Sequence, residues 1–241
     1  AWVAGSVGPL GVHLEPLGKT SLQEAQEAFA EQIRALTAGG PGVGVDLLIL
    51  ETMPALNEAE QAVLAARAAA PDVPVVVMVT IDEEANCLDG SSVEIAAARI
   101  ASWGVDGMGV NCSVGPATVL TAIERMAAAT SLPLMAMPNA GMPRSVDGRN
   151  IYLCSPEYMA SFARKFTRAG VQFIGGCCGT TAQHIRAMKS ALRATEAQAA
   201  SQRASRQEPI VTETPPVHVS ERSRLGRLIH EGAFVTMVEI M

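Results

Sequence analysis

The sequence predicts an α/β fold, a (β/α)8 TIM barrel that lacks about the first two βα units. The first observation is that short, apolar, often β-branched segments alternate with helical segments, as in buried parallel sheets. The second is that the carboxyl ends of these segments, near residues 51, 80, 112, 138 and 176, carry polar side chains or cysteine. Functional residues of such barrels lie at the carboxyl ends of the strands.

Six strands are expected, at residues 3–5, 45–51, 75–80, 107–111, 134–137 and 171–175. A complete barrel has eight strands and about 250 residues. We therefore expect the first two strands and helices to lie upstream of Ala1. An open, doubly wound sheet is the competing fold. It needs no further strands, but it gives no reason for five successive strand ends to be polar or to carry cysteine.

Helix signals follow the predicted strands. Capping boxes are expected at Ser21 with Glu24, Ser91 with Glu94, and Thr180 with Gln183. Pro116 and Pro156 stand at first helical positions, where proline is favoured. Residues 56–70 form an alanine-rich periodic segment, and the last capping box opens a helix over residues 184–192.

Composition excludes several classes of partner. The 241 residues carry a net charge of −6 without a cluster of lysine or arginine, so neither nucleic acid nor an anionic membrane is expected. No apolar run reaches the roughly 18 residues of a membrane span. Five cysteines, an odd number, and the lack of a signal peptide argue against a disulfide framework, so a cytoplasmic location is expected.

The chain changes character after residue 193. Residues 194–222 are rich in Gln, Ala, Ser, Thr and Pro and lose their periodicity, which is typical of a linker. Residues 225–230 have a helical pattern and residues 234–241 a strand pattern. The predicted division is a barrel over 1–193, a linker over 194–222 and the start of a second domain over 223–241.

The most informative residues are cysteines at two predicted strand ends. Cys112 lies in GVNCS at 109–113, and Cys177 and Cys178 lie in GGCCGT at 175–180. Three thiolates at two strand ends can hold one zinc ion and leave its fourth position open, as in catalytic sites. The glycines beside the pair permit both cysteines to converge on one ion. A vicinal disulfide or unrelated buried thiols are the alternatives, and Cys112 on the same rim favours the metal.

Zinc held by three thiolates is electron-rich and activates water poorly, but it suits a substrate thiol as fourth ligand. Coordination deprotonates that thiol. The predicted chemistry is therefore attack of a substrate thiolate on an alkyl group. Cys87 and Cys154 lie in predicted loops and are expected to be ordinary free cysteines, and the four histidines are expected to be surface or packing residues.

Five motifs, in order, resemble the zinc-dependent homocysteine S-methyltransferase family over about residues 1–193. They are VAGSVGP at 3–9, LET at 50–52, GVNC at 109–112, PNAG at 138–141 and GGCCGT at 175–180. Residues 223–241 resemble the opening of a methylenetetrahydrofolate reductase barrel. Together, the two parts resemble the bifunctional homocysteine S-methyltransferase/5,10-methylenetetrahydrofolate reductases. The Asp-Gly run of the homocysteine S-methyltransferase family's first strand is not present in this sequence.

The resemblance implies a TIM barrel with Zn2+ on Cys112, Cys177 and Cys178. It implies that Glu51 binds the amino group of homocysteine, with an exposed, solvated glutamate at the strand end as the alternative.

Four further residues are candidates for contact with substrate. Asn139 is expected at the open position of the metal or at the substrate, with a plain turn residue as the alternative. Ser6 and Thr80 are candidates that also suit backbone or helix-cap roles. Asn111 is a candidate whose more natural role is to orient the Cys112 loop.

The implied function is zinc-dependent methyl transfer to the thiol of homocysteine, giving methionine. The methyl donors left open are S-methylmethionine, betaine, methylcobalamin and methyltetrahydrofolate, and a fused reductase domain is expected in the parent chain. One alternative is a structural or redox cysteine module without catalysis. Another assigns the main activity to a downstream reductase with flavin and a nicotinamide cofactor, for which the sequence has no G-x-G-x-x-G run after a strand.

Overall fold

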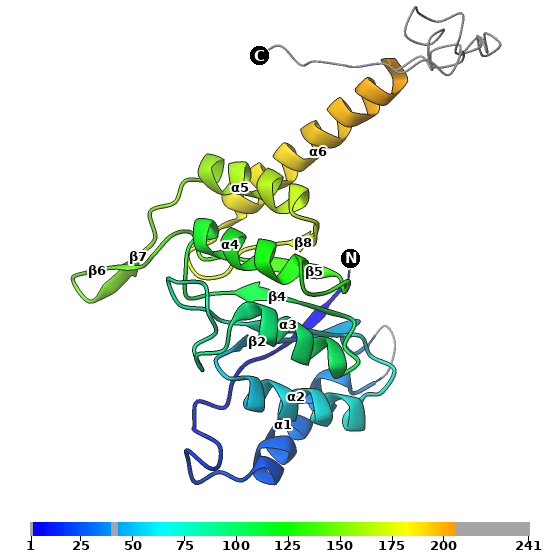
Figure 1. Cartoon of the computed structure of the whole chain (residues 1–241), viewed down its shortest axis with the longest axis vertical. Coiled ribbons are helices and arrows are strands. Elements are labelled where there is room, and N and C mark those ends of the chain that lie inside the picture. Colours follow the sequence, from blue (N-terminus) through cyan, green and yellow to red (C-terminus); the bar gives the residue numbers. More distant parts are fainter. Residues whose placement is uncertain (1, 40–42, 206–241) are drawn as a thin grey trace, which may run out of the picture. The chain divides into compact units, whose positions relative to one another are not determined.

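A computed structural model describes residues 2–39 and 43–205 of the chain. Its main sheet has six strands in the order β1-β2-β3-β4-β5-β8 (Figure 1). These strands are β1 (Ala4–Val7), β2 (Leu47–Met53), β3 (Val75–Val79), β4 (Gly107–Asn111), β5 (Leu134–Met137) and β8 (Val171–Ile174). All six were predicted, with small shifts at their ends.

The order of the strands decides between the two predicted folds. Each neighbouring pair in the sheet is parallel, and spatial order follows chain order. A doubly wound sheet reverses its strand order at a switch point, and the described strands show no reversal. Sequential parallel strands, each followed by a helix, are the arrangement of a TIM barrel. The fold is therefore α/β and part of such a barrel.

Six helices are described. They are α1 (Leu22–Thr37), α2 (Leu56–Ala69), α3 (Val93–Ser102), α4 (Pro116–Ala127), α5 (Pro156–Arg168) and α6 (Ala182–Ser205). The capping box of α1 is confirmed, because the Glu24 N–H donates to the Ser21 hydroxyl and the Ser21 N–H donates to the Glu24 carboxylate. Pro116 and Pro156 occupy the predicted first positions of α4 and α5.

The other two predicted caps were wrong by one residue. The hydroxyl of Ser92, not of Ser91, accepts from the N–H of Ile95 at the start of α3. Before α6, the Thr181 N–H donates to Nδ1 of His184, and its hydroxyl also contacts this nitrogen. The side chain of His184 therefore takes the capping role that was predicted for Gln183. It follows Thr181 by three residues, the same spacing as in the predicted pair of Thr180 and Gln183.

Two further differences concern whole segments. Helix α6 continues to Ser205, so residues 194–205 of the predicted linker are helical. Strong helix formers fill this stretch and sustain a helix without an apolar stripe. Strands β6 (Arg144–Val146) and β7 (Arg149–Ile151) form an antiparallel hairpin that was not predicted, and it projects from the main sheet (Figure 1).

The two faces of the sheet are covered unequally. On β2, Leu48 and Leu50 point to the helices and are fully buried, whereas Leu47 and Ile49 point to the opposite face and are only partly buried, because side chains alternate along a strand. The main core lies between sheet and helices, and the opposite face carries only a small cluster around Met78 and Met135.

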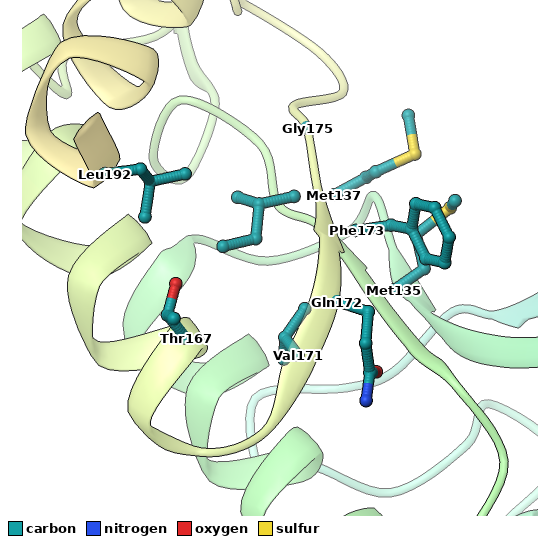
Figure 2. A pocket seen from close by; sticks show the side chains of 9 residues that line it. Met135, Met137, Thr167, Val171, Gln172, Phe173, Gly175 and Leu192 are labelled. Carbon is teal, nitrogen blue, oxygen red and sulfur yellow. The ribbon is translucent and has the colours of Figure 1, made fainter. Parts of the chain in front are cut away.

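A hollow of ≈ 560 Å³ lies along β8. In Figure 2, Met135, Met137 and Phe173 lie to one side of this strand, and Thr167, Val171 and Leu192 lie to the other. The hollow therefore follows the edge of the sheet, and no cysteine of the predicted metal site lines it.

No helix in the described part of the chain has the length and hydropathy needed to cross a membrane. The predicted helical segment 225–230 and strand 234–241 lie outside the described residues.

Candidate metal centre

Three cysteines meet at the carboxyl ends of the strands. The sulfur atoms of Cys112, Cys177 and Cys178 all lie within 4.8 Å of one another, and Cys112 Sγ is 3.7 Å from Cys178 Sγ. Cys112 and Cys177 are half-buried and Cys178 is exposed. The cluster is therefore held by the protein on one side and accessible on the other.

A left-handed turn aims Cys112 toward the pair. Its N–H donates to the Met137 carbonyl at 3.2 Å, which continues the ladder between β4 and β5. Cys112 and Ser113 then have φ angles of 62° and 56°, an uncommon conformation for residues other than glycine. At this turn the alternation of side chains along β4 ends. The Cys112 side chain therefore points toward the paired cysteines and not to one face of the sheet.

Backbone contacts with the segment after β5 hold the paired cysteines. The Cys177 N–H donates to the Pro138 carbonyl at 2.9 Å, and the Cys178 carbonyl accepts from the Ala140 N–H at 2.9 Å. Gly179 has a φ of 77°, and the Tyr152 ring occupies the space of its absent side chain, 2.3 Å from an ideal Cβ position. A side chain at position 179 would displace this ring.

The three sulfurs strongly affect one another's protonation. Hydrogen bonding from Cys177 lowers the pKa of the Cys112 thiol to about 5, with smaller contributions from Ser113, Cys178 and Asn139. The pKa of Cys177 is raised, first by its bond to Cys112 and then by burial. The lowered pKa of Cys112 favours its thiolate, which is the form that binds metals.

The cluster fits zinc. A tetrahedral ion with Zn–S bonds of about 2.3 Å separates its sulfur ligands by about 3.8 Å, close to the 3.7 Å between Cys112 and Cys178. In the described chain no histidine, carboxylate or further cysteine belongs to the group. Such a set leaves a tetrahedral ion one open position.

Glu51, near the end of β2, belongs to a polar network beside the cysteines. Its carboxylate accepts from the Ser6 hydroxyl and, at 3.0 Å, from the side-chain amide of Asn111. Asn111 also bonds Thr52 and lies 4.0 Å from Cys177 Sγ. The structure thus brings Ser6, Glu51 and Asn111 together next to the metal-ligand candidates.

The remaining predicted site residues are buried near the cysteine loops. Asn139 is 2% exposed, and its side-chain oxygen accepts from the Cys178 N–H at 3.1 Å. Thr80 is also 2% exposed, and its hydroxyl is hydrogen-bonded to that of Ser113. Both residues therefore support the loops that carry the cysteines.

Cys87 and Cys154 lie outside the cluster, as expected. Burial raises the pKa of both thiols, that of Cys87 to about 12. Neither Tyr152 nor the specific role of His184 was predicted from the sequence. His184 is buried, and its Nε2 contacts the Cys154 carbonyl at 2.9 Å, which ties the start of α6 to that loop. Its three-residue spacing from Thr181 is a signal for this cap, whereas no sequence signal indicates the contact of Tyr152.

The fold and the site together define a class of protein, a parallel α/β barrel with three clustered cysteines at its carboxyl rim. The homocysteine S-methyltransferase family model matches residues 1–192. Methionine synthases of Mycobacterium leprae and Mycobacterium tuberculosis are 33% and 32% identical over 196 residues, which is 79% of this chain and 16% of each relative.

Solved structures of the homocysteine methyltransferase MmuM from Escherichia coli are also similar. The apo form is 28% identical with a TM-score of 0.63, over 79% of this chain and 62% of that one. The metallated form is 27% identical with the same TM-score, over 78% and 60%. The chain belongs to the homocysteine S-methyltransferase family, and it spans about a sixth of the length of the synthases it matches.

Proposed function

We propose that this chain binds zinc through Cys112, Cys177 and Cys178 and transfers a methyl group to the thiol of homocysteine, giving methionine. The supporting observation is the cluster of three sulfurs, all within 4.8 Å of one another, on the carboxyl rim of a chain of this family. Bound zinc would favour the thiolate form of the substrate thiol at neutral pH.

Glu51 is proposed to bind the amino group of homocysteine. Its carboxylate is fixed by Ser6 and Asn111 and is half-buried beside the cysteines. A fixed carboxylate holds an ammonium group through a charge-assisted hydrogen bond. The substrate would then be held at both ends, and such orientation removes part of the barrier to methyl transfer.

Asn139 and Thr80 are proposed to hold the cysteine loops, through Cys178 and Ser113 respectively. Asn139 is also proposed to contact the open position or the substrate, since its side chain accepts from the Cys178 N–H next to the three sulfurs. Ser6 is proposed to act through Glu51, because its hydroxyl donates to that carboxylate.

The test of this function is a zinc determination combined with a methyl-donor screen on the chain within its full-length protein. Methionine formation from homocysteine would be followed with S-methylmethionine, betaine, methylcobalamin and methyltetrahydrofolate. We expect one donor to support turnover that a zinc chelator abolishes. Full activity of zinc-free protein would contradict the proposal. The fused reductase and the cytoplasmic location stay predictions.

The alternative is a structural or redox cysteine module without catalysis, with a closed metal site or a reversible Cys177–Cys178 disulfide between sulfurs that lie within 4.8 Å of each other. X-ray absorption at the zinc edge separates the two functions. Three sulfur ligands that rise to four on addition of homocysteine support the enzyme. Four protein ligands before any addition support the module.

A further inference from the structure

Asn111 lies between the carboxylate proposed to bind substrate and the cysteines proposed to bind metal. It is the last residue of β4, and its exposed fraction is 0%. A side chain with no exposed surface has no direct route to a substrate. Its influence on the site must pass through the residues that it contacts.

All the polar atoms of the Asn111 side chain are engaged. The oxygen accepts from the Thr52 N–H at 2.8 Å. The amide nitrogen donates to the Thr52 hydroxyl at 2.8 Å and to Oε2 of Glu51 at 3.0 Å, and it lies 4.0 Å from Cys177 Sγ. One buried amide therefore contacts the end of β2 and one cysteine of the pair.

The bonds to Thr52 hold an unusual backbone turn. Thr52 has a φ of 60°, which is an outlier for a β-branched residue. Such a conformation persists only where its surroundings hold it. Asn111 binds both the N–H and the hydroxyl of Thr52, so it fixes the turn that directs the preceding residue, Glu51.

We propose that Asn111 is a positioning residue that sets the direction of the Glu51 carboxylate and its distance from Cys177. By doing so it sets the preference of the site for thiols that carry an α-amino group. This inference rests on the proposed roles of Glu51 and the three cysteines. It adds a residue that acts on substrate selection without touching substrate.

The test compares two thiols on the cobalt-loaded full-length protein. Homocysteine has an α-amino group, and 4-mercaptobutanoate is the same molecule without it. Binding of each is followed by the thiolate-to-cobalt charge-transfer absorption, which does not depend on turnover. Asn111→Asp keeps the shape and the acceptor for Thr52, but it removes the donor to Glu51 and places a second carboxyl group beside the Glu51 carboxylate, so both changes disturb the position of Glu51.

We expect Asn111→Asp to weaken homocysteine binding about tenfold or more, as for the loss of a buried hydrogen bond to a charged group. Binding of 4-mercaptobutanoate and the metal content should stay unchanged. Thr52→Val keeps the shape at position 52, removes one partner of Asn111 and should act in the same direction more weakly. In a Glu51→Gln background, Asn111→Asp should have little further effect, because coupled residues are not additive.

Asn57→Asp is the matched control, since this asparagine on α2 uses its side-chain oxygen to accept from Glu58 and Asp retains that acceptor. Equal losses for both thiols, or loss of metal, would overturn the role of Asn111. Independent effects of Asn111→Asp and Glu51→Gln would overturn it too. If the unaltered protein binds neither metal nor homocysteine, the proposed function itself is wrong, and the two failures are thus distinguishable.

Discussion

At the residue scale, Cys112 is the one proposed metal ligand that follows β4, whereas Cys177 and Cys178 share one loop. Cys112→Ser should lower zinc affinity by more than about 100-fold, since even loss of a partner outside the ligand set costs 10- to 100-fold. Zinc per chain after dialysis, and competition with a chelator, measure this. Cys154→Ser is the control, and equal zinc loss in both variants would contradict the assignment.

The backbone of the neighbouring strand leaves no room for a side chain at Gly109. A Cβ added there would lie 1.8 Å from the Met135 carbonyl oxygen on the neighbouring strand β5. Gly109→Ala should therefore destabilise the fold by more than about 3 kcal/mol, the upper range of ordinary overpacking. Gly8, whose added Cβ meets nothing within 4 Å, should tolerate alanine within about 0.5 kcal/mol. Denaturant unfolding of both variants measures the difference, and similar midpoints would refute the steric argument.

The sequence predicted the cysteines better than the residues that support them. Cysteine beside glycine at a strand end is a local signal, and it indicated Cys112 and the pair correctly as neighbours. The bonds of Asn111 to Glu51 and Thr52 join residues 60 and 59 positions apart. Which side chains meet over such separations depends on the register of β2, β3 and β4, and no local pattern contains that information.

At the element scale, Arg125 of α4 links two helices and a loop. Its guanidinium pairs with Glu94 of α3 at 2.7 Å and donates to the Ala85 carbonyl. The hydrogen bond to Arg125 lowers the pKa of the Glu94 carboxyl to about 2. The predicted box of Ser91 with Glu94 does not form, because the Ser91 N–H donates to Asp89 while Arg125 binds the Glu94 carboxylate.

Because the pKa of Glu94 is depressed, the stability of the fold depends on pH. Its stabilising contribution is present above the unfolded pKa of about 4.3 and is lost as pH falls through the folded value of about 2. Glu94→Gln should therefore lower the thermal midpoint at pH 7, and the difference from wild type should shrink between pH 4.5 and pH 2. Thermal unfolding over this range measures it. Glu124→Gln, at an exposed position of α4 outside the described ion pairs, should show no such trend.

Elements with strong periodicity were predictable, and two others were not. The turn of the β6–β7 hairpin is Asp147-Gly148 with φ angles of 49° and 71°, and Asp-Gly is a known hairpin signal. Its strands are only three residues long, too short to show alternation. The end of α6 was missed for a different reason. Residues 194–205 have high helix propensity but no apolar periodicity, and the prediction relied on that periodicity.

At the scale of the whole molecule, the main sheet has two edges. Among the described strands, β1 and β8 each pair on one side only. Exposed apolar side chains lie at or beside both edges, with Trp2 80%, Val3 57% and Phe173 53% exposed. An unpaired edge strand is a template for pairing with another chain, and apolar exposure strengthens the association.

This 241-residue chain should therefore self-associate as its concentration rises, with the β8 edge as a contact. Phe173→Lys removes about 1.5–3 kcal/mol of apolar burial from such a contact and should raise the dissociation constant about tenfold or more. Leu64→Lys, at a 49% exposed position of α2 away from the edges, adds the same charge and should change little. Sedimentation velocity over a concentration series measures both variants. A monomer at every concentration, or equal effects of the two lysines, would show that the open edges are not where molecules meet.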